Sequence, residues 1–178
     1  MMLQQTIISP SIDGIMDIKN TFKISTLNTS GLNTTIKQEY LINFMNINDV
    51  KILGVTKTKF TINTGQHLYK NHKDYKAWWF FTDTYHYSQD IGIIINNSYA
   101  KYVAIQHTFK GRILALTLFL KGKIRFMIIV IYNYANNTMK KEITELYAHV
   151  KVFIKEETKH KTRIIIMGDF NANYDDYQ

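Results

Sequence analysis

Two strand–helix–strand successions, one in each half of the chain, constrain the fold more than any other feature of the sequence. In the first, the apolar runs 22–28 and 50–56 flank residues 33–48, in which Asn33 or Thr34 can cap a helix. Strands joined by a helix pair in parallel, so this unit predicts a layered α/β structure. The expected buried stripe of the helix is Ile36, Tyr40, Leu41, Phe44 and Ile47.

The residues between the two units are typical of strands joined by short turns. Turns at 110–111 and 121–123 separate long apolar runs and resemble hairpin connections. A second helix is expected from Asn137 onward, before a last apolar strand. Its predicted stripe is Met139, Ile143, Leu146, Tyr147, Val150 and Ile154, and Glu156 and Glu157 are expected on its solvated face. We therefore expect a sheet-rich α/β sandwich over residues 22–178, preceded by a flexible extension over residues 1–21.

Composition limits the chemistry that the chain can perform. The 178 residues include no cysteine, which excludes disulfides, thiolate zinc sites and cysteine nucleophiles, and leaves hard ions such as magnesium as the favoured metals. The net charge of +8 suits a nucleic-acid partner, although the abundance of Lys, Asn, Ile and Tyr is also what an AT-rich genome would produce. Neither a secretory leader nor an apolar run of membrane-spanning length is visible, so we expect a soluble, intracellular protein without a membrane partner.

The last apolar run ends in a candidate site. Residues 164–167 are β-branched or apolar and are followed by Gly168, Asp169, Phe170 and Asn171. In layered α/β folds, ligands and catalytic groups collect at the carboxyl ends of strands. Asp169 and Asn171 are two residues apart, so in an extended segment they face the same side and could hold a water, a metal or a phosphate oxygen. The alternative is an ordinary Asx-rich turn that leaves the strand.

Four segments in order, "KISTLNTSGLN", "DVKILGVTKTK", "GRILALTLFL…IRFMIIVIYNYANN" and "RIIIMGDFNAN", resemble the endonuclease/exonuclease/phosphatase superfamily. This is the family of deoxyribonuclease I, abasic-site endonucleases and the endonucleases of non-LTR retrotransposons, and the retrotransposon branch is the most similar. The resemblance covers about residues 22–178. It implies a deoxyribonuclease I-like four-layer α/β sandwich, incomplete here because the family's last strands lie beyond Gln178.

The resemblance also implies roles for individual residues. Asn28 matches the asparagine that orients the metal and the phosphate, and Tyr134 matches the tyrosine that contacts the scissile phosphate. Asp169 matches the aspartate that activates the attacking water, and Asn171 matches its partner at the developing phosphorane. The implied activity is magnesium-assisted hydrolysis of a phosphodiester, with DNA as the favoured nucleic-acid substrate.

Two departures from the family concern the same chemistry. Lys57 stands where the family has its principal metal ligand, a glutamate. Two unit charges ~4 Å apart repel by about 4 kcal/mol at an effective dielectric of 20, so a fixed cation there disfavours magnesium. The family's catalytic histidine has no counterpart, and Asn136 replaces the usual proline near Tyr134. One hypothesis is that the Lys57 ammonium takes the metal's place and pairs with Asp169; the other is that Lys57 is simply solvated.

These features favour a magnesium-dependent phosphodiester hydrolase, a DNA endonuclease of retrotransposon type, with impaired catalysis. The alternative is a non-catalytic, degenerate domain that at most binds nucleic acid weakly through its basic middle. Trp78 and Trp79 could stack on bases, but an aromatic run at the start of an interior strand is more often part of the core.

Overall fold

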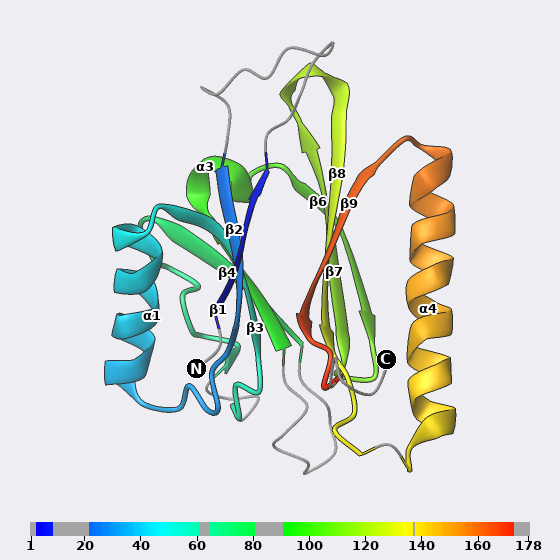
Figure 1. Ribbon diagram of the computed structural model, residues 1–178. Coiled ribbons are helices and arrows are strands. Elements are labelled where there is room, and N and C mark those ends of the chain that lie inside the picture. The colour runs from blue at the N-terminus through cyan, green and yellow to red at the C-terminus, as the bar shows by residue number, and fades with distance from the viewer. Residues whose placement is uncertain (1–2, 9–21, 61–64, 81–90, 137, 173–178) are drawn as a thin grey trace.

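The computed structural model describes residues 3–8, 22–60, 65–80, 91–136 and 138–172, which form two β-sheets packed face to face (Figure 1). The first sheet has the order β1 (Leu3–Ile8), β2 (Phe22–Asn28), β3 (Val50–Thr56), β5 (Ile91–Asn96) and β4 (Tyr75–Phe80). The second has the order β6 (Val103–Phe109), β7 (Ile113–Leu120), β8 (Ile124–Tyr132) and β9 (Arg163–Asp169).

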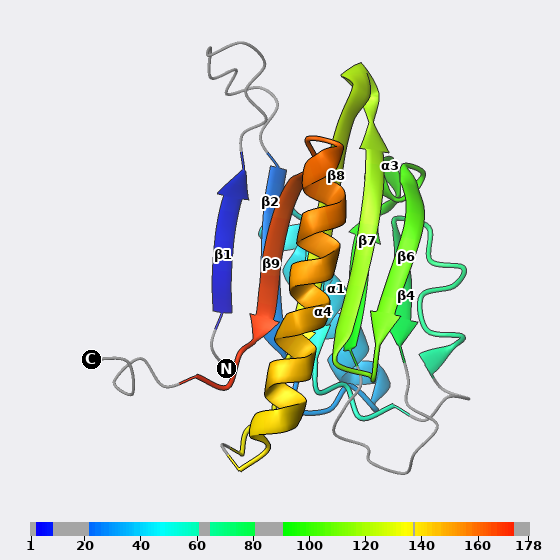
Figure 2. The same cartoon turned by 90° about the vertical axis from the view of Figure 1, so that its right-hand side faces the viewer.

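Helices cover the two outer faces, so the molecule has four layers. Helix α1 (Thr35–Ile47) lies on the first sheet, and α4 (Lys140–Lys159) lies along the second (Figures 1 and 2). The short α3 (Asn97–Ala100) connects the sheets, and a 3₁₀ turn, η2 (Lys121–Lys123), joins β7 to β8. Among the helices of the described residues, none has the length and hydrophobicity that crossing a lipid bilayer requires.

Side chains alternate between the two faces of each strand, and together they fill the three spaces between these layers. On β5, Ile93 and Ile95 face the second sheet, whereas Ile94 faces α1. On β8 the even-numbered Ile128 contributes to the core between the sheets, and the odd-numbered Ile129 packs under α4. Strands that are apolar on both faces are what a doubly covered sheet requires.

The pairing predicted from the sequence is largely confirmed. Strands β2 and β3 are parallel, as are β8 and β9, and β6, β7 and β8 form an antiparallel meander. Residues 91–109, which the sequence alone suggests as a single strand, form β5 and β6, because α3 moves the chain from the first sheet to the second. The segment 1–21, expected as a flexible extension, contributes β1, which pairs antiparallel with β2, and its other residues lie outside the described part.

The predicted stripe of α1 is partly wrong. The helix buries Leu41, Ile42 and Met45 against the first sheet, and Thr34 caps it by accepting a hydrogen bond from the amide of Lys37. Three members of the predicted stripe are instead on the solvent side, with exposed fractions of 64% for Ile36, 69% for Tyr40 and 84% for Ile47. Both sets of residues have helical spacing, so periodicity alone could not decide which one faces the sheet.

Glu157 is also not where the sequence placed it. Its side chain is 6% exposed and accepts two hydrogen bonds of 2.7 Å from the guanidinium of Arg125 on β8. The hydroxyl of Thr162 donates a third hydrogen bond, at 2.6 Å. This buried ion pair fastens the end of α4 to β8 just before the chain enters β9, whereas Glu156 is exposed as expected.

Candidate active site

The carboxyl ends of two parallel strand pairs meet at one edge of the sandwich. In the first sheet, Asn28 at the end of β2 is paired with Thr56 at the end of β3; in the second, Tyr132 of β8 is paired with Asp169 of β9. The amide Nδ2 of Asn28 donates a hydrogen bond to Oδ2 of Asp169 at 2.7 Å. This contact joins the two sheets and brings together two of the four predicted site residues, which are 141 positions apart in the chain.

Gly168 explains how the chain can place Asp169 there. Its φ is +134°, in a region that side chains rarely adopt, and a Cβ on it would lie 1.9 Å from the carbonyl oxygen of Ile131. The absence of a side chain therefore lets β9 approach β8 closely at the position just before the carboxylate. The Gly-Asp sequence is a structural requirement of this edge, not only the beginning of a turn.

Asp169 is half-buried and lies at the centre of a hydrogen-bonded web. Its Oδ1 accepts from the backbone amide of Asn171 at 3.1 Å, and its backbone carbonyl accepts from the amide of Asn133 at 2.8 Å. Asn171, with a φ of +45°, donates its side-chain amide to the carbonyl of Asn133 at 2.6 Å. The side-chain amide of Asn133 in turn donates to the carbonyl of Phe170 at 2.9 Å. The Asx turn considered from the sequence is thus present, and it sits at the joint edge of the sheets.

Tyr134 is held by a buried cation that the sequence analysis did not select as a site residue. The guanidinium of Arg112 lies 3.6 Å from the centre of the Tyr134 ring and donates to the carbonyl of Tyr132 at 3.1 Å. Arg112 is 7% exposed, and its Nε has no hydrogen-bond partner. Burial lowers the pKa of Arg112 from its ordinary value, and the neighbouring tyrosines oppose this change. Stacking on an aromatic face is a common way to hold a guanidinium.

Arg112 and Asn133 are therefore the residues that sequence reasoning missed. The segments "GR" and "YNY" that contain them belong to the motif from which the resemblance was drawn, so their signal was present. Arg112 contacts Tyr134, and Asn133 contacts Phe170. The two residues of each pair are far apart in the sequence, and no local pattern reveals such contacts.

Lys57 follows β3 directly, next to Asn28, but it does not pair with the carboxylate. Among the ion pairs of the described residues, none joins Lys57 to Asp169, so the hypothesis of a substituting salt bridge is wrong for this structure. The carbonyl of Lys57 accepts from the amide of Gly31 at 2.8 Å and from the hydroxyl of Thr29 at 3.2 Å. The loops after β2 and β3 are thus tied together beside the candidate site.

The residues of this edge do not fit a magnesium site. Within the described parts of the chain, no group of three or more His, Asp or Glu side chains could hold a metal ion. Asp169 is one carboxylate, and both of its oxygens already accept hydrogen bonds. Magnesium depends on carboxylates and phosphates for its binding, so this chain's own side chains offer it little.

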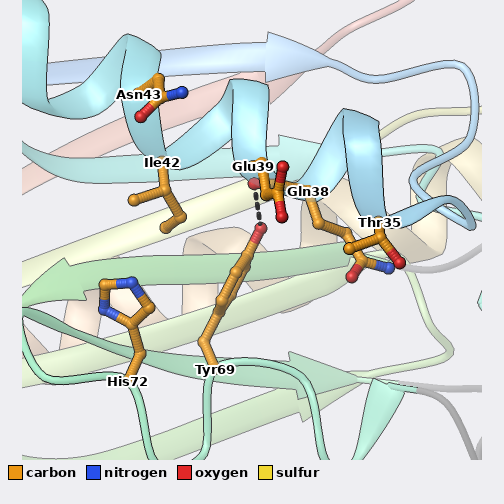
Figure 3. Close-up of a pocket in the computed structure, with 7 residues that line it drawn as sticks. All are labelled: Thr35, Gln38, Glu39, Ile42, Asn43, Tyr69 and His72. Carbon is orange, nitrogen blue, oxygen red and sulfur yellow. Dashed lines mark hydrogen bonds between the residues drawn. The ribbon is translucent and has the colours of Figure 1, made fainter.

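Two other features of the sequence have ordinary structural roles. Trp78 packs against the core between the sheets, and Trp79 packs under α1 and donates to the carbonyl of Leu68 at 3.3 Å. A separate cavity lies between α1 and the segment that contains Tyr69, whose hydroxyl donates to the carbonyl of Gln38 at 2.8 Å (Figure 3). None of the predicted site residues lines this cavity.

Comparison with solved structures identifies the architecture. D. rerio TDP2 complexed with a single-stranded DNA product matches with a TM-score of 0.63 and 18% identity over 85% of this chain and 61% of that one. The human Nocturnin catalytic domain with a bound sulfate anion matches with a TM-score of 0.64 and 14% identity over 95% and 68%. The AP endonuclease LMAP from Leishmania major matches with a TM-score of 0.62 and 18% identity over 96% and 61%.

The chain has the deoxyribonuclease I-like fold. The resemblance to the endonuclease/exonuclease/phosphatase superfamily is thereby confirmed at the level of the fold. The chain spans between 61% and 68% of the length of these three deoxyribonuclease I-like structures. No protein-family model matches the sequence, and no curated protein sequence does either.

Proposed function

We propose that this chain is a nuclease-type domain that binds a phosphodiester of DNA at the joint edge of its sheets, and that its magnesium-dependent cleavage is weak or absent. The hydrogen bond between Asn28 and Asp169 carries this proposal, because it places an amide donor and a carboxylate from two sheets side by side. Amide donors suit phosphate oxygens, and a carboxylate can orient a water for attack. The DNA product bound by D. rerio TDP2 supports DNA as the ligand.

Each residue of the edge would have a distinct task. Asp169 would hold the attacking water and accept its proton, while Asn28 fixes the orientation of the carboxylate. Asn171 uses one side-chain N–H on the carbonyl of Asn133, and its second N–H would be available to a phosphate oxygen. Tyr134, held by the Arg112 guanidinium, would contact the phosphate through its hydroxyl. The motif "YNYANN…GDFN" supports a retrotransposon-type origin.

No step is assigned to magnesium, because the donor set does not fit it. The poor fit of these side chains to magnesium favours a second candidate function, that of a non-catalytic domain that binds nucleic acid. The two candidates share the binding site and differ only in whether the bond is broken. Changing the charge of residue 57 is the simplest way to distinguish the two candidate functions.

Nicking of a supercoiled plasmid, with magnesium and with EDTA, tests the proposal. We expect nicking by the unaltered chain to be close to background and Lys57→Glu to raise it only when magnesium is present. Adding Asp169→Ala to that variant should remove the gain. Vigorous magnesium-dependent nicking by the unaltered chain would contradict the impairment, and nicking that survives Asp169→Ala would contradict the site.

A further inference from the structure

Three lysines surround the loop that follows β2, next to Asn28. Lys57 and Lys59 come from the segment after β3, and Lys37 comes from the first turns of α1. The ammonium of Lys37 donates to the carbonyl of Gly31 at 3.2 Å, and the Lys59 side chain passes within 3.5 Å of the position that a Gly31 Cβ would occupy. We name Lys37, Lys57 and Lys59 the lysine ridge.

The segment that carries two of these lysines is fixed in place. Thr58 is fully buried and Phe60 is 4% exposed, whereas Lys57 and Lys59 are not buried, so the two cations alternate with two anchors. The carbonyl of Thr58 accepts from the amide of Leu32 at 2.7 Å. Lys57 and Lys59 are therefore the accessible positions of a segment that its neighbours hold in place.

The backbone at both lysines is strained. Lys57 has a φ of +59° and Lys59 a φ of +55°, in a region that costs a residue with a side chain roughly 1–2 kcal/mol. Strained positions of this kind cluster at ligand clamps. Neither lysine forms an ion pair with a carboxylate of the described residues, so their charges are not offset by neighbouring side chains.

We propose that the lysine ridge binds the phosphate backbone of a nucleic acid, without a metal ion, and leads the strand toward Asn28 and Asp169. Two accessible cations separated by one residue suit a chain of phosphates better than a single phosphate. A lysine next to the site can neutralise a phosphate directly, which is the task that a divalent cation would otherwise share. The proposal rests on the function proposed above only for the class of its ligand.

The opposite end of the second sheet offers a matched control. Lys121 and Lys123 flank Gly122 in the turn between β7 and β8, at the end of the second sheet opposite Asp169 (Figure 1). Lys121 and Lys123 are both exposed, are separated by one residue, and include a residue of positive φ, Lys123 at +61°. Replacing either pair by glutamine lowers the net charge from +8 by the same two units.

The experiment is fluorescence anisotropy of an end-labelled single strand of DNA in EDTA, over a range of salt concentrations. Losing two phosphate contacts should lower the slope of log affinity against log salt by about 1.4, and affinity at low salt by roughly tenfold or more. We expect this for Lys57→Gln/Lys59→Gln but not for Lys121→Gln/Lys123→Gln. Equal losses in both variants, or no loss in the first, would overturn the proposal.

Two further arms separate this proposal from the proposed function and from a simpler ligand. In an Asp169→Ala background, Lys57→Gln/Lys59→Gln should lower the salt slope by the same amount as in the unaltered chain, because the lysine ridge contacts the phosphates independently of that carboxylate; a slope that the lysine replacements leave unchanged in this background would overturn the proposal. Inorganic phosphate should compete only weakly with the labelled DNA. If phosphate competed as effectively as unlabelled DNA, compared per phosphate group, the lysine ridge would be a site for single phosphates, and the proposal that it binds a nucleic-acid backbone would be overturned. Circular dichroism of both lysine variants must show that they are folded.

Discussion

Replacing Gly168 by alanine tests how the fold positions Asp169. A Cβ at this position would lie 1.9 Å from the carbonyl oxygen of Ile131, whereas real Cβ atoms stay at least 3.0 Å from such atoms, so the strands must separate by about 1.1 Å. The φ of +134° adds strain of about 1–3 kcal/mol, and overpacking against a neighbour adds about 1–3 kcal/mol. We therefore expect Gly168→Ala to lower the free energy of unfolding by roughly 2–6 kcal/mol.

Equilibrium unfolding in urea measures this loss, and Gly122→Ala is its control. Gly122 also has a positive φ, +76°, but a Cβ there would meet nothing within 4 Å, so only the conformational cost of about 1–2 kcal/mol should appear. The two variants should therefore differ by the overpacking contribution, about 1–3 kcal/mol. Equal losses in the two variants would show that close approach of β9 to β8 at Gly168 does not matter.

Three further predictions concern the packing of the helices. Arg125→Met should lower the free energy of unfolding by about 2–3 kcal/mol, less than the ~3–5 kcal/mol of a fully buried pair, because the Arg125 side chain is 19% exposed. Burial raises the pKa of Glu157, but hydrogen bonds from Arg125 and Thr162 outweigh it and leave the pKa below the ordinary 4.5. The stabilisation should be complete above pH 4.5 and disappear as the pH falls below it, so unfolding curves of the unaltered chain and Glu157→Gln should converge in acid. Met45→Ala should cost about 2–5 kcal/mol in urea unfolding and Ile47→Ala less than about 0.5 kcal/mol, and equal costs would reverse the faces assigned to α1.

The strand framework was predictable because its signals are local. Apolar runs such as 22–28 and 50–56 have the length of strands, and a helix between them leaves only parallel pairing. The orientation of α1 was not predictable, because Ile36, Tyr40 and Ile47 repeat at the same helical spacing as the residues that the helix buries. Which stripe faces the sheet depends on contacts with β3, β4 and β5, and residues of β4 and β5 are far from α1 in the sequence.

The site was predictable where a strand end or a motif indicated it. Asp169 was selected from its place after the last apolar run and Asn28 only through the resemblance, and the structure brings the two into contact. The burial of Glu157 was missed, because its partner Arg125 is 32 positions away and an acidic pair on a helix usually faces solvent. The role of Arg112 under Tyr134 was missed for the same reason, since it depends on two strands aligning in one sheet.

The measurement that tests the central claim most directly is a titration of the ¹⁵N-labelled chain with a short DNA strand, followed by NMR in EDTA. The account predicts that the side-chain amide signals of Asn28 and the backbone amide of Asn171 shift together and saturate at one affinity. In Asp169→Ala, where the hydrogen bond of the Asn28 amide is gone, the free-state signals of Asn28 should already differ. Shifts confined to residues away from this edge, with Asn28 and Asn171 unmoved at saturation, would contradict the claim that the joined strand ends bind the phosphodiester.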